Sequence, residues 1–110
     1  MAIETRLQWE DAGTLYHPDG GSWSKTRREA EASWSTPLGP GRYRIARVES
    51  RNGGYWEVVR LRPSNSTFKF NGKPRRFSGY GLGNPVNMQE AMAIAERDNA
   101  RLHEAEQLKL

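Results

Sequence analysis

The sequence contains no cysteine and only two histidines. Without cysteine the chain can form no disulfide, no thiolate zinc site and no cysteine nucleophile. His17 and His103 lie far apart in the chain, and neither has a second imidazole four residues away, so we expect no metal site. The carboxylates are dispersed, and no serine stands in a recognisable nucleophile motif. We therefore expect a protein that is not an enzyme and needs no cofactor.

Long apolar runs are also missing. Apolar residues make up 35% of the chain, and none of their runs approaches the ~20 residues that a membrane span requires. The first residues lack the basic region and apolar stretch of a secretory signal. We expect one domain over residues 1–110, located in the cytoplasm, with no membrane partner and no small-molecule ligand. Four Trp, four Tyr and three Phe supply the apolar area for one core.

Acidic residues are scarce in the middle of the chain. Residues 42–76 contain ten basic and two acidic side chains, so this stretch carries +8, while each flank carries −2 and the total is +4. Positive charge gathered in one region is the distribution that attracts a polyanion.

The same region has the pattern of an antiparallel β-meander, which we place at residues 42–80. Apolar and basic residues alternate from Arg42, an off-register Val48 suggests a bulge near Ala46, and residues 51–54 form a hairpin turn signal. We expect one face of this sheet to form the core through Tyr43, Ile45, Tyr55, Val59, Leu61, Phe68, Phe70 and Phe77. The opposite face would then display Arg42, Arg44, Trp56, Arg60, Arg62 and Lys69.

The flanking segments complete an α+β fold. Before the meander, residues 1–41 suggest an opening strand from Ile3 to Trp9 that stops at residues 11–13, short extended pieces, and a short helix over residues 27–32 with a capping-box spacing. After it, Asn87 and Glu90 have the spacing of a capping box, and apolar residues recur every three or four positions. We predict an antiparallel meander of about four to six strands, with a C-terminal helix over residues 87–107 packed on one face.

A tryptophan–valine strand pattern, a basic hairpin, a Leu-Gly step and the helix MQEAMAIAE follow one another over residues 53–100. This order resembles the DNA-binding domains of the APETALA type and the arm-binding domains of tyrosine integrases, which combine a three-stranded sheet with one helix. It is also similar to small prophage-encoded proteins. The resemblance implies that the sheet enters the major groove of duplex DNA with the helix behind it. The contacts that it implies come from Arg44, Trp56, Arg60, Arg62, Lys69 and Arg75, and we add the basic residues Arg42 and Arg76.

Two other interpretations of these residues stay open. Arginines on a sheet often form only its solvated face, and a tryptophan such as Trp56 is more often a core residue or the partner of a neighbouring arginine than a platform for a base. The same basic surface also suits an acidic protein surface. The leading hypothesis is therefore a non-enzymatic module that binds nucleic acid, preferably duplex DNA. The alternative is a prophage-type accessory or inhibitor protein that binds a host protein.

Overall fold

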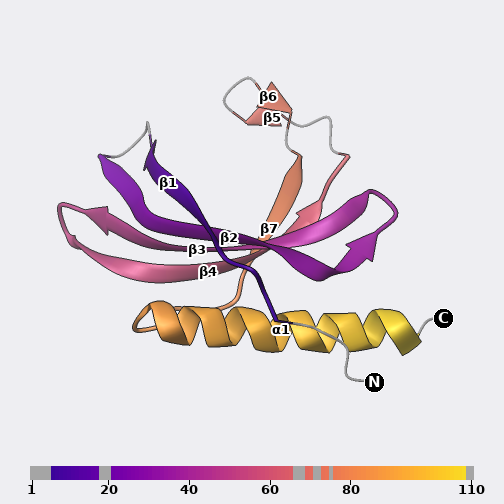
Figure 1. Ribbon diagram of the computed structural model, residues 1–110. Helices are drawn as coiled ribbons and strands as arrows, with labels where there is room; N and C mark the ends of the chain where they lie inside the picture. Colours follow the sequence, from indigo (N-terminus) through magenta and orange to yellow (C-terminus); the bar gives the residue numbers. More distant parts are fainter. Residues whose placement is uncertain (1–5, 18–20, 66–68, 71–72, 75, 109–110) are drawn as a thin grey trace.

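A computed structural model describes residues 6–17, 21–65, 69–70, 73–74 and 76–108 (Figure 1). Its elements, in chain order, are β1 (Glu10–His17), β2 (Ser22–Thr36), β3 (Gly39–Ser50), β4 (Gly53–Pro63), β5 (Lys69–Phe70), β6 (Lys73–Pro74), β7 (Phe77–Gly81) and α1 (Met88–Leu108).

Five of the strands form one antiparallel sheet in the order β1-β2-β3-β4-β7, so each strand pairs with the one before it apart from the β5–β6 insertion. Strands β5 and β6 pair with each other in a separate two-stranded ribbon. Helix α1 lies along one face of the sheet, and the ribbon stands on the side away from the helix (Figure 1). The predicted α+β meander with one C-terminal helix is confirmed.

The core lies between α1 and the sheet. Small residues on the helix, Ala91 and Ala95, are fully buried, so the helix axis approaches the strands closely. The other buried members of the cluster are Leu7, Ala30, Ala32, Trp34, Tyr43, Ile45 and Val58. No helix among the described residues is long and apolar enough to cross a membrane.

Helix α1 begins at the predicted Asn87 cap, with Glu90 reaching back one residue further than in a standard capping box. The side-chain oxygen Oδ1 of Asn87 accepts a hydrogen bond from the backbone N–H of Glu90 at 2.8 Å, and the Glu90 carboxylate accepts one from the N–H of Val86 at 3.3 Å. These bonds satisfy two donors near the end of the helix.

The N-terminal expectations were partly wrong. Residues 27–32, predicted as a short helix, lie in the middle of β2, where pairing with β1 and β3 on both sides outweighs the local capping signal. Residues 6–9 are not a strand; Leu7 instead packs into the core, and β1 starts at Glu10 and includes the residues expected to end it. Ile3 lies outside the described residues.

The sheet irregularities lie in β1 and β2 and not in β3. Pairing between β3 and β4 is uninterrupted from Arg42 to Ser50, so the bulge expected near Ala46 is absent from this pair of strands. In β2 the register to β3 shifts between Lys25 and Arg28, where Thr26 has a φ of 52°, and again between Glu31 and Ser35. Thr26 therefore occupies a left-handed conformation that suits a bulge.

The hairpin between β3 and β4 decides which residues share a face. Ser50 pairs with Gly53, so the turn has two residues and each odd-numbered position of β3 lies opposite an even-numbered position of β4. Tyr43 thus faces Arg60, and Ile45 faces Val58, on the side that α1 covers. The predicted core face was wrong for β4, because it grouped odd positions with odd positions. Tyr55, Val59 and Leu61 lie on the side opposite α1 together with Arg42 and Arg44, although Leu61 is itself buried, as predicted.

Candidate nucleic-acid interface

Most basic side chains of the five-stranded sheet have an acidic partner. On its strands the ion pairs are Lys25–Glu49, Arg28–Asp11, Arg42–Glu29, Arg44–Glu57 and Arg47–Glu49, and Arg60 pairs with Asp98 of α1. The sheet surface is therefore a mixture of both charges, and it does not present the uniformly basic face that the sequence suggested.

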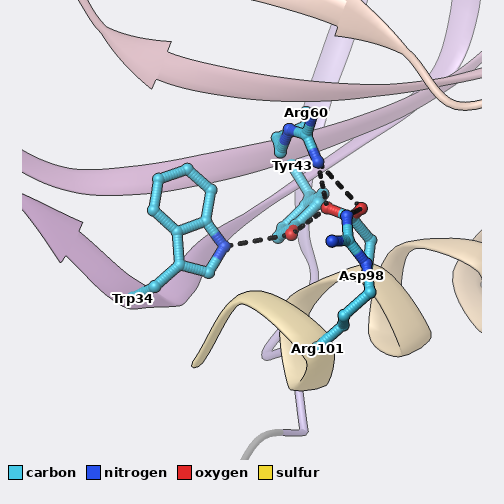
Figure 2. Close-up of polar contacts among 5 residues, drawn as sticks. All are labelled: Trp34, Tyr43, Arg60, Asp98 and Arg101. Carbon is cyan, nitrogen blue, oxygen red and sulfur yellow. Dashed lines mark hydrogen bonds and ion pairs between the residues drawn. The ribbon is translucent and has the colours of Figure 1, made fainter. Parts of the chain in front are cut away.

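Arg60 belongs to a buried polar cluster beneath the sheet (Figure 2). Its Nη1 lies 2.9 Å from Oδ1 of Asp98 on α1, and Arg101 reaches the same carboxylate oxygen at 3.0 Å. The hydroxyl of Tyr43 donates to Asp98 Oδ2 at 2.6 Å and accepts a hydrogen bond from Trp34 Nε1 at 3.0 Å. The side chain of Arg60 is only 14% exposed, so it holds the helix to the sheet and is not placed to reach a ligand.

Tyr43 stays protonated in this cluster. Its burial and its hydrogen bond to the Asp98 carboxylate raise the pKa of the phenol well above the ordinary value, and the nearby Arg60 opposes this only in part. The Tyr43 hydroxyl therefore always donates to the Asp98 carboxylate while it accepts from the Trp34 indole. The cluster has a structural role: it holds the helix to the sheet.

Arg42 and Arg44 lie on the open face, as predicted, but among carboxylates. Arg42 Nε is 3.9 Å from Glu29, and Arg44 Nε is 3.8 Å from Glu57. Glu31 also stands directly across from Arg42 on β2. Two cations among three carboxylates leave this part of the sheet with little net charge to attract a polyanion.

Trp56 does not lie on the face that carries Arg42 and Arg44. It pairs across the sheet with Arg47, which follows the alternation of Tyr43 and Ile45 onto the covered side, and it is half-buried. The arrangement implied by the resemblance to three-stranded DNA-binding domains needs arginines and this tryptophan together on the face opposite the helix. The fold separates them instead.

Arg62 and Arg76 differ from these residues. Arg62 was predicted on the face of Arg42 and Arg44, but the register places it on the other side of the sheet, where it is exposed and its guanidinium lies 5.2 Å from the centre of the Trp34 ring. Arg76 is exposed at the start of β7, and neither arginine has an acidic partner within the described part of the chain. Of the remaining predicted residues, Lys69 contributes its backbone to β5, and Arg75 lies outside the described residues.

The remaining positive charge lies mainly in residues 62–76, which we name the basic arm. The arm contains five basic residues, Arg62, Lys69, Lys73, Arg75 and Arg76, and no acidic residue, so it carries +5. Because the whole chain carries +4, all other residues together carry −1. Lys73 was not among the predicted site residues, although the absence of any carboxylate between Arg62 and Arg76 is visible in the sequence.

The two ends of the basic arm are fixed side by side. The backbone N–H of Ser64 donates to the carbonyl of Arg76 at 2.8 Å, and Pro63 pairs with Phe77 where β4 meets β7. The sheet therefore brings the two ends of the arm together, and the β5–β6 ribbon lies between them in the chain. The ribbon stands beyond the edge where β4 and β7 meet (Figure 1).

Comparison with known proteins found no matching family model, no matching curated protein and no matching solved structure. Among the described residues, His, Asp and Glu form no group of three or more that could hold a metal ion. The candidate site is therefore defined by charge and geometry alone.

Proposed function

We propose that the protein is a non-enzymatic module that binds nucleic acid, with duplex DNA as its main ligand, through the basic arm. The observation that carries the proposal is the charge separation: +5 on the arm against −1 on the rest of the chain. Phosphate contacts supply most non-specific affinity for DNA, and they require cations that are not already neutralised. The proposal assigns the protein to the cytoplasm, where it would meet this ligand.

The structure of the arm suits such contacts. Arg62 is held over the Trp34 ring, a cation–π arrangement that keeps its guanidinium exposed while restricting its motion. A guanidinium also presents several N–H donors to phosphate oxygens at once. The two-stranded pairing of β5 with β6 has the form that the major groove of B-DNA accepts.

The proposal relocates the contacts that the sequence suggested. Arg62, Lys69, Arg75 and Arg76 remain as phosphate contacts, with Lys73 added, and Arg42 is removed from the duplex contacts because of its ion pair with Glu29. Arg60 and Trp56 are assigned to the structure of the domain, and Arg44 to its ion pair with Glu57.

The experiment compares two double variants with equal charge changes. Arg62→Gln with Arg76→Gln removes two cations from the arm. Arg51→Gln with Arg97→Gln removes two exposed cations from the β3–β4 turn and from α1. Fluorescence anisotropy of a labelled duplex of about 20 base pairs should show weaker binding for the arm variant and near wild-type binding for the other, since only phosphate-contacting cations contribute to counterion release. Equal weakening by both variants would contradict the assignment to the arm.

An acidic protein surface is the other ligand that the arm would suit. In that case the protein would bind no generic duplex at low salt, and the DNA assay would show no difference between the arm variant and the wild type. That result would remove the nucleic-acid proposal and leave a prophage-type accessory or inhibitor role as the remaining hypothesis.

A further inference from the structure

A pocket opens at the base of the basic arm, where the β2–β3 turn meets the end of β4 and the start of β7. It encloses about 390 Å³, which is within the range of small-ligand sites. The residues that give it its chemistry are Leu38, Arg42, Ser64, Asn65, Arg76 and Phe77.

The charge of this pocket is positive. Arg42 and Arg76 are its charged members, and the described residues that line it include no carboxylate. Glu29 balances part of the charge of Arg42, but the 3.9 Å between Nε and the carboxylate is too long for a hydrogen bond, so the N–H groups of this guanidinium can still donate to a second anion. Two guanidinium groups at one pocket are suited to a phosphate group.

The other walls of the pocket are apolar. Leu38 is 57% exposed at the β2–β3 turn, Phe77 is half-buried, and Pro40 and Pro63 add rigid apolar surface. A single exposed leucine is common on protein surfaces. Here, however, it lines the same pocket as an aromatic ring and two cations, a combination that suits a ligand with both a flat ring and a phosphate.

Hydrogen bonds within the walls of this pocket hold it in shape without a ligand. In the turn, Leu38 N–H donates to Thr36 Oγ1 at 3.1 Å, and the Thr36 hydroxyl donates to the Gly39 carbonyl at 3.1 Å. The opposite wall is fixed by the bond between Ser64 and Arg76. Because the walls are already ordered, a ligand would lose little affinity to ordering them.

We propose that the pocket binds one unpaired nucleotide, with its phosphate on Arg42 and Arg76 and its base against Phe77 and Leu38. Asn65, an exposed residue of the lining, brings a side-chain amide that can hydrogen-bond to the edge of a base. The proposal rests on the proposed function and sharpens it: the protein prefers a duplex that continues into a single strand, because the arm holds the duplex and the pocket holds the first unpaired base.

The experiment uses the full chain and three labelled duplexes of about 20 base pairs. One is blunt, one carries an overhang of about five unpaired bases, and one carries an abasic overhang of the same length, which keeps the phosphates but lacks the bases. Stacking of one base predicts that the overhang binds roughly 5- to 100-fold tighter than the abasic overhang. Leu38→Ser removes the apolar wall opposite Phe77, so it should lower this ratio and leave blunt-duplex affinity unchanged. Leu15→Ser, which alters an exposed leucine on β1, should keep the wild-type ratio.

The outcomes separate the two proposals. If the blunt duplex binds and weakens with salt, but the ratio of the two overhangs is one, the pocket proposal is overturned and the proposed function stands. A ratio that Leu38→Ser leaves at the wild-type value overturns it as well. If none of the three duplexes binds, the proposed function fails, and the pocket proposal fails with it.

Discussion

Arg60 of β4 and Asp98 of α1 form an ion pair of 2.9 Å between the sheet and the helix, 38 positions apart in the chain. Asp98 is 9% exposed and also accepts hydrogen bonds from Tyr43 and Arg101. The alternation of residues in the sequence predicted that Arg60 lies on a DNA-binding face. In the structure it instead attaches the helix to the sheet.

Replacement of Arg60 should therefore affect stability more than binding. In Arg60→Ala the buried Asp98 carboxylate keeps Arg101 but loses its less exposed partner, and we expect the free energy of unfolding to fall by about 3 kcal/mol. Urea denaturation measures this change. Arg44→Ala is the matched control, because its pair with Glu57 is long and partly exposed, and it should cost about 0–1 kcal/mol. Equal costs would show that the buried cluster does not hold the helix.

Tyr43→Phe tests the centre of the same cluster. The change removes the acceptor of Trp34 Nε1 and a donor to Asp98, both in buried positions, so we expect a loss of about 1–3 kcal/mol. Chemical denaturation near pH 7 measures it. A variant as stable as the wild type would mean that these two hydrogen bonds contribute nothing net to folding.

Because the pKa of Tyr43 is raised in the folded protein, we expect the free energy of unfolding to fall at alkaline pH. Its pKa in the folded protein lies above the ordinary value of 10.0, so the unfolded chain loses this proton first. The contribution of Tyr43 is complete below pH 10 and is lost as the pH rises further, at no more than about 1.4 kcal/mol per pH unit. The difference in unfolding free energy between wild type and Tyr43→Phe, measured at several pH values, should shrink above pH 10. A constant difference would contradict the raised pKa.

Gly41 tests the packing of Trp34, which supports Arg62. A Cβ atom at position 41 would overlap the Trp34 ring, so Gly41→Ala should displace the indole and cost about 1–3 kcal/mol. Gly81→Ala is the control, because a Cβ there meets nothing within 4 Å. Thermal denaturation should show a lower melting temperature for the first variant only. If both variants melt like the wild type, Trp34 does not pack against Gly41.

The sequence was sufficient to predict those parts of the fold that depend on neighbours in the chain. Asn87 and Glu90 cap α1 within one turn, and the hairpin at residues 51–54 forms where its turn residues place it. The face of β4 was not predicted in the same way, because a change of the loop length by one residue exchanges every side chain of the strand between the two sides.

The candidate site could likewise be predicted only in part from the sequence. Ion pairs such as Arg60 with Asp98 join residues that are distant in sequence, so a count of arginines along the meander could not show which ones were already neutralised. The strand at residues 27–32 likewise depends on partners from β1 and β3. The sequence does show that no carboxylate lies between Arg62 and Arg76. This run stands out in the structure because most of the other cations have an acidic partner there.

The most direct test of the central claim is the salt dependence of duplex binding, measured by anisotropy for the wild type and for Arg62→Gln with Arg76→Gln. If the five cations of the arm each contact a phosphate, the logarithm of the association constant should fall with the logarithm of salt concentration with a slope of roughly −4 to −5, and the double variant should reduce its magnitude by about 2. Wild-type binding with a slope near zero, or a slope that the double variant leaves unchanged, would contradict the account.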